Sequence, residues 1–231
     1  LLKVSGEWFS GSNEKGFDKK TFISLSESLI AAKRKKIQIA LVLGGGNIYR
    51  GRELTSLNID QVSADYIGML STIMNGIALS NFLSSNDCEN SLFSSFAIGN
   101  FVKAYSKEEA ERALVEDKIV ILVGGLGNPL FTTDSTASVR AVELNADVML
   151  KATNVDGVYS EDPKINKEAI KYDHLSFEEA ITKNLKVMDQ TSLCFCRDNN
   201  LSVRVFNADA EEAILETIIN ENTDIGTLVE L

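Results

Sequence analysis

The sequence is poor in the residues that usually build metal sites and nucleophilic triads. It contains one histidine, His174, and three cysteines, Cys88, Cys194 and Cys196. A lone histidine in a polar turn assembles neither a metal site nor a catalytic triad, so we expect it to be exposed and predict no metal held by the protein alone. An odd number of cysteines, two of them too close for a structural disulfide, favours a reducing compartment, and we expect a cytoplasmic protein.

Long apolar stretches and an excess of basic residues are also missing. The runs 37–43, 119–123 and 148–150 are far shorter than the roughly 20 residues that span a bilayer, and no charged-then-apolar leader precedes them. We therefore expect no membrane association. The net charge of −10 argues against a nucleic-acid partner, because such binding needs lysine and arginine to neutralise phosphates. Small phosphorylated ligands need only a local positive pocket and remain possible.

The sequence is built from alternating strand-like and helix-like segments. With 231 residues, 44% of them hydrophobic, it can form one large core, and no linker divides it. Strands are predicted at 1–4, 37–43, 118–123, 147–150, 203–206 and 226–231, and helices at 18–36, 65–77, 107–116, 134–145, 176–183, 189–199 and 209–221. The alternation predicts an α/β three-layer sandwich in one domain, 1–231, with a mostly parallel central sheet and the last strand at its edge.

Glycine is concentrated where the predicted strands end. Ser5-Gly6, the run Gly44–Gly46 and the run Gly124–Gly127 each follow a strand. Any one of them could be only a tight turn, but three at the carboxyl edge of one parallel sheet favour a phosphate site, because glycine lets main-chain N–H groups approach an anion. None has the spacing of a P-loop or of the dinucleotide fingerprint, so neither a P-loop kinase nor a dehydrogenase is predicted.

Charged residues stand beside these glycine loops. Lys3 lies at the tip of the first strand, where a lysine is hard to explain as packing, and would direct its ammonium group toward the phosphates. Arg50 and Arg52 follow the second glycine run, and Arg50 is the stronger candidate for a phosphate contact. Asp134 begins a predicted helix, so on the sequence alone it is either an N-cap or a catalytic carboxylate.

The glycine loops belong to a series of motifs that runs along the whole chain. The motifs are 2–7, 44–51, 65–70 with 74–76, 127–134, 151–159, 162–163, 186–189 and 204–207. In content and order this series resembles the bacterial uridylate (UMP) kinases of the amino acid kinase superfamily. The glycine loops alone imply only the superfamily, which also contains amino-acid and carbamate kinases. The helix motif Asp65-x-x-Gly-Met-Leu and the loop Gly127-Asn-Pro-x-Phe-Thr-Thr-Asp134 narrow the resemblance to UMP.

The resemblance implies how the loops divide between two nucleotides. The implied ATP-binding residues are Lys3, Val4, Ser5, Gly6, Gly46 and Arg50, mainly toward the phosphates, and Thr153, Tyr159 and Asp162 toward the nucleoside. The implied UMP-binding residues are Gly45, Asp65, Leu126, Gly127, Asn128, Pro129, Leu130, Phe131, Thr132 and Thr133. Residues 1–150 would then form mainly the UMP lobe and residues 151–231 mainly the ATP lobe.

The same resemblance implies the catalytic groups, which are Lys3, Asp134 and Asp189. Phosphoryl transfer requires mainly positioning and charge stabilisation, which Lys3, main-chain N–H groups and Mg²⁺ carried by the nucleotide can supply. The two aspartates would orient the lysine and magnesium or the two phosphates. Lys151 is either a second phosphate contact or a salt-bridged structural lysine. The resemblance also implies ATP and UMP as substrates and a homohexamer, with the helix around 69–77 at an interface.

Some positions depart from the family pattern. Leu126 stands where the family usually has a small hydroxyl residue, Asn154 replaces an often basic residue, and the segment 84–95 lacks the arginine found in members activated by GTP, which argues against GTP activation. Two alternatives to a UMP kinase stay open. A kinase for an amino acid or carbamate would leave Asp65 without a ribose to bind, and the complete set of Lys3, Asp134 and Asp189 argues against a catalytically silent nucleotide sensor.

Overall fold

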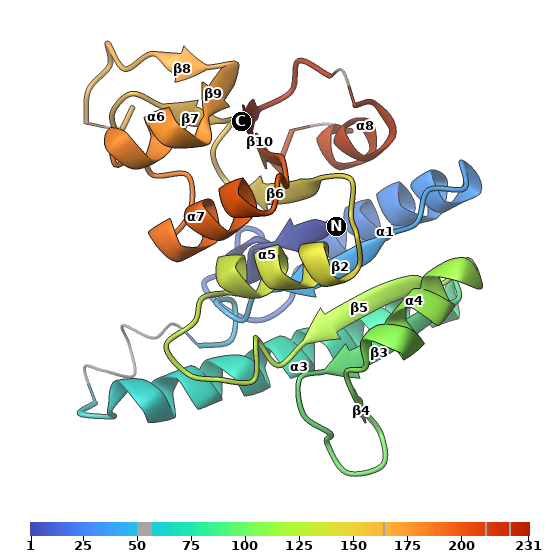
Figure 1. Ribbon diagram of the computed structural model, residues 1–231. Coiled ribbons are helices and arrows are strands. Elements are labelled where there is room, and N and C mark those ends of the chain that lie inside the picture. Colours follow the sequence, from blue (N-terminus) through green and yellow to red (C-terminus); the bar gives the residue numbers. More distant parts are fainter. Residues whose placement is uncertain (50–56, 164, 211, 222) are drawn as a thin grey trace.

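One large sheet runs through the molecule (Figure 1). The computed structural model describes residues 1–49, 57–163, 165–210, 212–221 and 223–231. Within these residues the sheet has nine strands in the order β4-β3-β5-β2-β1-β6-β10-β11-β9. The strands are, in that order, Lys103–Ala104, Asn90–Ser94, Ile119–Val123, Ala40–Leu43, Leu2–Val4, Met149–Thr153, Val203–Asn207, Thr227–Glu230 and His174–Ser176.

The sheet is parallel except where β11 meets β10. The mostly parallel sheet predicted from the sequence is therefore confirmed. The prediction that the last strand lies at the edge was wrong, because β9 adds to its far side with Leu175 opposite Val229. The polar three-residue strand β9 gives little signal in the sequence, although Leu175 is only 3% exposed.

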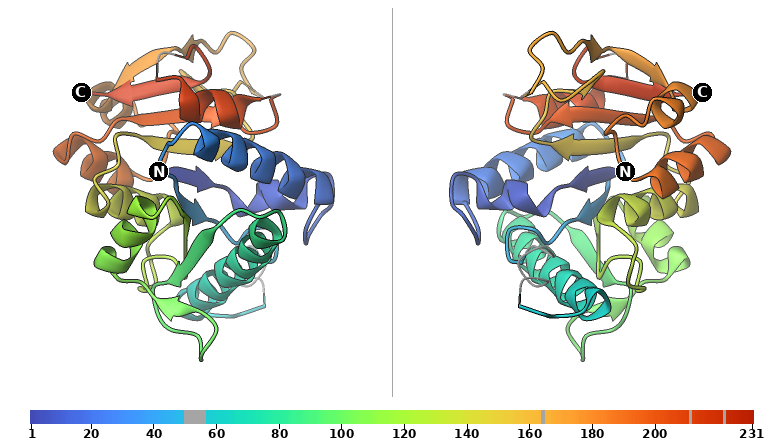
Figure 2. Two further views of the ribbon diagram at one scale, coloured as in Figure 1. Left: turned by 90° about the vertical axis from the view of Figure 1, so that its right-hand side faces the viewer. Right: turned by 90° about the vertical axis from the view of Figure 1, so that its left-hand side faces the viewer.

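Helices cover both faces of the sheet, and Figure 2 shows the resulting three layers. On one face lie α1, α3 and α8, and on the other α4, α5, α6 and α7. In chain order these helices are Lys19–Arg34, Gln61–Ser85, Lys107–Val115, Thr133–Glu143, Phe177–Thr182, Gln190–Asp198 and Ala213–Ile219. Because strand side chains alternate, Leu2 and Val4 of β1 pack under α1 and α8, whereas Lys3 points to the face of α5.

Several of the described helices begin after a residue whose side chain caps the first turn. Side-chain oxygens of Asp18, Ser106, Ser176 and Asp189 each accept hydrogen bonds from main-chain N–H groups in the first turn of α1, α4, α6 and α7. The last helix, α8, begins at Ala213 rather than at the predicted position 209. The short 3-10 helix η1 (Gly6–Ser10) and the hairpin of β7 (Val158–Tyr159) and β8 (Lys171–Tyr172) were not predicted.

The long helix α3 is the one described helix with the length and apolar character to cross a membrane, but 44% of its most apolar stretch is buried inside the protein. It lies close to the sheet at Gly76. A Cβ atom placed on Gly76 would lie 2.6 Å from Val123 Cγ1 and 2.8 Å from Leu92 Cδ1. The helix can therefore pack this close to the sheet only because residue 76 has no side chain. By contrast, a Cβ on Gly68 of the same helix would meet nothing within 4 Å.

We expect Gly76→Ala to lower the free energy of unfolding by about 1–3 kcal/mol, because the new methyl group must displace core side chains. Gly68→Ala is the matched control, and its better helix propensity should leave stability unchanged or raise it by up to about 1 kcal/mol. Chemical denaturation of both variants measures the difference. Equal effects of the two substitutions would contradict the close approach at Gly76.

Candidate active site

The first two glycine loops lie against each other at the carboxyl ends of β1 and β2. A Cβ on Gly6 would lie 2.3 Å from the main-chain nitrogen of Gly46, and one on Gly45 would lie 2.8 Å from Gly68 O in α3. No other residue fits at these contacts without movement of the main chain. The loops therefore place main-chain groups of three segments in one small volume, as an anion site requires.

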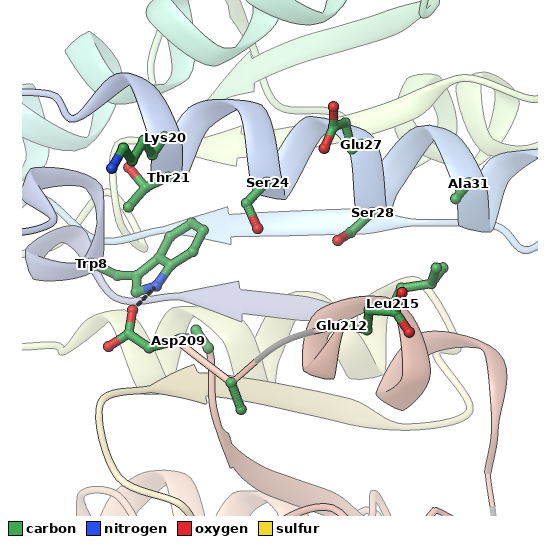
Figure 3. A pocket seen from close by; sticks show the side chains of 12 residues that line it. Trp8, Lys20, Thr21, Ser24, Glu27, Ser28, Ala31, Asp209, Glu212 and Leu215 are labelled. Atoms are coloured by element: carbon green, nitrogen blue, oxygen red, sulfur yellow. Dashed lines mark hydrogen bonds between the residues drawn. The ribbon is translucent and has the colours of Figure 1, made fainter.

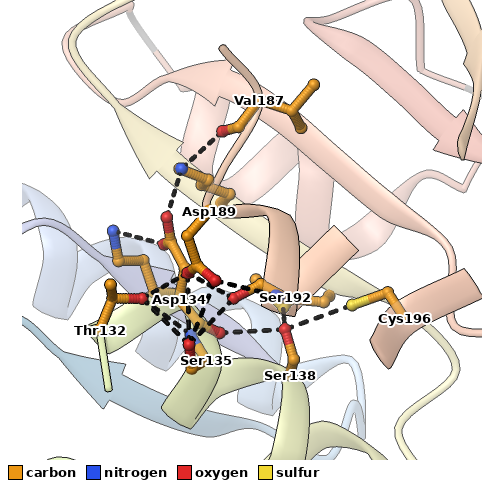
Figure 4. Close-up of polar contacts among 11 residues, drawn as sticks. Thr132, Asp134, Ser135, Ser138, Val187, Asp189, Ser192 and Cys196 are labelled. Atoms are coloured by element: carbon orange, nitrogen blue, oxygen red, sulfur yellow. Dashed lines mark hydrogen bonds and ion pairs between the residues drawn. The ribbon is translucent and has the colours of Figure 1, made fainter. Parts of the chain in front are cut away.

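A buried cluster of one carboxylate and two ammonium groups lies beside these loops (Figure 4). Lys3 and Lys151 are paired neighbours on the parallel strands β1 and β6, so their side chains share one face. Asp134, in the first turn of α5, lies between them: Oδ1 is 2.9 Å from Lys3 Nζ, and Oδ2 accepts a 2.6 Å hydrogen bond from Lys151 Nζ. Lys151 Nζ also donates to the carbonyl of Val187 at 2.6 Å.

Asp134 is therefore not the N-cap of its helix, and that alternative was wrong. The cap is Thr132, whose hydroxyl oxygen accepts from Ser135 N at 3.1 Å. The Asp134 side chain forms ion pairs with Lys3 and Lys151 instead. Lys151 is salt-bridged, as one of the two alternatives predicted, and it remains close enough to Lys3 to add to the positive charge at the sheet edge.

The charges of this cluster depend on one another. Burial alone would raise the pKa of Asp134, but the positive charges of Lys3 and Lys151 outweigh it and lower the pKa to about 2. Burial is also the main cause that lowers the pKa of Lys151, with the Asp134 carboxylate acting in the opposite direction. Asp134 is thus ionised across the physiological range, and it compensates one of the two positive charges held at the strand ends.

Asp189 joins the loop before α5 to the start of α7. Its Oδ2 accepts hydrogen bonds from Thr132 Oγ1 at 2.5 Å and from Ser192 Oγ at 2.6 Å, and its Oδ1 accepts from Ser192 N at 2.9 Å. Ser135 Oγ lies 3.3 Å from Oδ2. Burial would raise the pKa of Asp189, but the hydrogen bonds from Ser192 and Thr132 lower it. The structure thus brings together Lys3, Asp134 and Asp189, the three residues for which the resemblance implies catalytic roles.

The third glycine loop is held by α3. Asp65 Oδ2 accepts a 2.7 Å hydrogen bond from Leu130 N, and Thr72 Oγ1 accepts a 2.8 Å hydrogen bond from Gly124 N. Gly124, Gly125 and Gly127 have positive φ angles of 77°, 58° and 85°, which glycine adopts without strain. The predicted acceptor residues 126–133 therefore form one ordered loop beside Asp65, ending in the Thr132–Asp189 contact.

A buried pair of amides, which was not predicted from the sequence, joins α3 to the second glycine loop. Asn75 donates to Asn47 Oδ1 at 2.7 Å, Asn47 donates to Asn75 Oδ1 at 2.9 Å, and Asn75 Nδ2 also lies 2.6 Å from Gly44 O. Asn47 and Asn75 are both buried. The available signal was an asparagine in the middle of an otherwise apolar helical stretch, since a buried amide needs polar partners.

The residues predicted around the nucleoside of ATP lie at the end of β6 and in the segment that follows it. Thr153 ends β6, and its carbonyl accepts from Ala208 N at 2.8 Å. Tyr159 donates its hydroxyl to Asp156 at 2.9 Å, and the Asp162 carbonyl accepts two main-chain hydrogen bonds in the following turn. Ser5 directly follows Val4, the last residue of β1, and its main-chain nitrogen lies 3.4 Å from the carbonyl oxygen of Ala152. The predicted residues Arg50 and Arg52 lie outside the described part of the chain.

The histidine and cysteines were not predicted to act in this site. Cys196 borders its hydrogen-bond network, because Sγ donates to Ser138 Oγ at 3.3 Å (Figure 4). His174 is exposed at the sheet edge, with Nδ1 3.6 Å from Glu230 Oε1, as expected. Cys88, Cys194 and Cys196 are free thiols. Burial raises the pKa of Cys196 to about 11, so its thiol stays protonated and serves as a filler of the core.

The sequence matches the family described as "Amino acid kinase family" over residues 1–207, and the chain belongs to that family. Within it, the chain is 42% identical over 230 residues to the uridylate kinase of Alcanivorax borkumensis, covering 100% of this chain and 90% of that protein. It is also 42% identical to the uridylate kinase of Coxiella burnetii, with 100% and 94% covered.

Solved structures agree with these relatives. The fold superposes on the UMP kinase from Bacillus anthracis with a TM-score of 0.95 at 34% identity, covering 100% of this chain and 94% of that one. For the UMP kinase from Ureaplasma parvum the TM-score is 0.93 at 37% identity, with 100% and 97% covered. The predicted amino acid kinase fold is therefore confirmed.

The charge cluster predicts a specific dependence of stability on pH. The folded-state pKa of Asp134, about 2, lies below its ordinary value of 3.8, so the stabilisation from this carboxylate is present above pH 4 and is lost as the pH falls toward 2. We expect the gap in unfolding free energy between wild type and Asp134→Asn to shrink by about 2 kcal/mol over that interval. Urea denaturation at several pH values measures it, and a gap that does not change with pH would contradict the ion cluster.

Proposed function

We propose that this protein transfers the γ-phosphoryl group of ATP to UMP, giving ADP and UDP. The observation that carries the proposal is the position of the Lys3–Asp134–Lys151 cluster. It lies near the carboxyl ends of β1 and β6, where the proposed acceptor loop 127–134 leads into α5. The likeness of the whole chain to uridylate kinases supports UMP as the acceptor.

Lys3 is proposed to stabilise the charge on the transferring phosphoryl group. Its side chain comes from a strand that is buried on both faces, and Asp134 fixes its ammonium group. A fixed positive charge in a partly buried site needs little reorganisation when the charge moves in the transition state. Because phosphoryl transfer needs mainly positioning and charge, no strong general base is required. Ser5, Gly6 and Gly46 would approach the ATP phosphates through their main chain.

Asp65 and the acceptor loop are proposed to hold UMP. The Asp65 carboxylate receives hydrogen bonds from Leu130 N and from Gln61. Each carboxylate oxygen has more than one acceptor site, so Asp65 can accept from ribose hydroxyls as well. Residues 1–150 would thus form mainly the acceptor lobe and residues 151–231 mainly the ATP lobe, with Thr153, Tyr159 and Asp162 toward the nucleoside.

Magnesium fits this site as an ion carried by the nucleotide. The oxygens of Asp134 face two ammonium groups, and those of Asp189 accept hydrogen bonds from three residues. Among the described residues no group of three or more histidine, cysteine or carboxylate side chains could hold a metal ion, and the two aspartates alone do not form the cage that a divalent cation requires. When bound with ATP, magnesium would supply positive charge at this site. Asp134 would orient the ammonium groups of Lys3 and Lys151, and Asp189 would orient the hydroxyl groups of Thr132 and Ser192.

The acceptor is tested by ADP production from ATP and Mg²⁺ with UMP, CMP, aspartate, acetylglutamate and carbamate offered separately. We expect turnover with UMP and not with the amino acids or carbamate.

In the same assay Lys3→Ala should lose at least about 10²–10³-fold in kcat, because it removes charge stabilisation of the transition state. The exposed Lys103 is the control position, and Lys103→Ala should keep wild-type turnover. If the wild-type protein bound nucleotides without any turnover, it would be a nucleotide sensor and not a kinase.

We further propose a homohexamer in the cytoplasm, in which α3 contributes an interface with a second copy of the chain. Apolar side chains on α3 stay exposed at helical spacing: Val62, Tyr66, Leu70, Met74 and Ile77, each 38–53% exposed. A continuous apolar stripe on a helix is typical of a surface that packs against another protein. The three free cysteines are consistent with a reducing compartment.

Leu70→Glu should therefore break the assembly into smaller species, because it places a charge in the middle of the stripe. Val115→Glu is the control, since Val115 is 78% exposed at the end of α4, away from the stripe. Light scattering with size-exclusion chromatography measures the molar mass of both variants. An unchanged mass for Leu70→Glu would place the contact between copies elsewhere.

A further inference from the structure

The single tryptophan of the chain joins two segments that lie 201 residues apart. Trp8 Nε1 donates a 2.8 Å hydrogen bond to Asp209 Oδ1 (Figure 3). The indole is only 8% exposed and meets the ring of Phe9 at a centroid distance of 6.0 Å. A large aromatic ring held by packing and by one directed hydrogen bond has little freedom to move.

Trp8 and Asp209 each belong to a segment that contacts the proposed ATP site. Trp8 N donates to the Ser5 carbonyl at 3.1 Å, so the indole belongs to the same tight turn as Ser5 and Gly6. On the other side, Asp209 follows Ala208, whose N–H donates to the carbonyl of Thr153 at 2.8 Å. The bond thus connects the turn predicted to hold the phosphates with the strand end predicted to hold the nucleoside.

The bond also borders an open hollow, so the packing around it is incomplete on one side. A cavity of about 480 Å³ lies between α1 and the loop before α8, and Trp8 and Asp209 form part of its wall. The loop has a strained end, since Glu212 has a positive φ of 58°. Without the hydrogen bond, the turn after β1 and the loop after β10 have room to separate.

We propose that Trp8 and Asp209 form a latch that sets the spacing between the phosphate turn and the nucleoside side of the ATP site. They are positioning residues, which act through Ser5, Gly6 and Thr153. This inference rests on the proposed ATP site. A latch that exists before ATP arrives lowers the cost of ordering these segments on binding, so its loss weakens ATP binding more than it slows the chemical step.

The test compares steady-state kinetics of Trp8→Phe and Asp209→Ala with wild type. Each should raise KM for ATP roughly three- to tenfold, the range expected for one hydrogen bond, with kcat within about twofold and KM for UMP unchanged. Asp209→Asn keeps an acceptor oxygen and should restore a KM for ATP near wild type. Asp224→Ala removes an exposed carboxylate of the same lobe and serves as the charge control.

A double variant and fluorescence complete the test. Trp8→Phe with Asp209→Ala should raise KM for ATP no more than either change alone, because both remove the same bond. As the only tryptophan, Trp8 should also change its emission in Asp209→Ala and keep it in Asp209→Asn. An unchanged or lower KM for ATP in Asp209→Ala would overturn the latch, as would an equal rise in both KM values. If Lys3→Ala kept full activity, the ATP site would be misplaced instead.

Discussion

The buried cluster of Lys3, Asp134 and Lys151 is the constraint on which the site depends. Two ammonium groups on neighbouring strands repel each other, and their removal from water is costly unless a carboxylate is present. Asp134 supplies that carboxylate from the first turn of α5, which fixes where α5 begins relative to β1 and β6. Removing one partner from such a cluster typically costs about 3–5 kcal/mol, so the arrangement is held strongly. One net positive charge remains where an anion would bind.

Hydrogen bonds connect this cluster to the loop that we propose binds the acceptor. The start of α5 is capped by Thr132, whose hydroxyl also binds Asp189, so the position of α7 is coupled to that of α5. The loop that leads to Thr132 is in turn held by Asp65 and by the contact of Gly124 N with Thr72. A long helix on one face of the sheet and two helices on the other face therefore meet through one loop.

The sequence predicted the parts of the fold that are governed by local periodicity and by caps. The helices predicted at 18–36 and 107–116, for example, are found at Lys19–Arg34 and Lys107–Val115, where Asp18 and Ser106 cap their first turns. It did not predict β9, because three residues with one buried leucine carry no pattern of their own and pair only once β11 is in place. Nor did it place the start of α8, since Asp209 is engaged by Trp8 from the other end of the chain.

The difference between local sequence patterns and contacts of distant segments applies to the candidate site as well. Glycine loops and single charged residues can be found in a sequence because each has its own local reason, such as the close contact at Gly6. Contacts between distant segments cannot be found in this way, and they decide roles: on the sequence alone Asp134 was either a cap or a catalytic carboxylate, and no local pattern indicates the partners of Asn75 or Trp8. In each case the partner lies at least 17 positions away, at Lys151, Asn47 or Asp209, and only the sheet order brings it near. Because the strand order places β6 between β1 and β10, Lys151 lies beside Lys3 on one side of β6 and Thr153 lies beside Asn207 on the other.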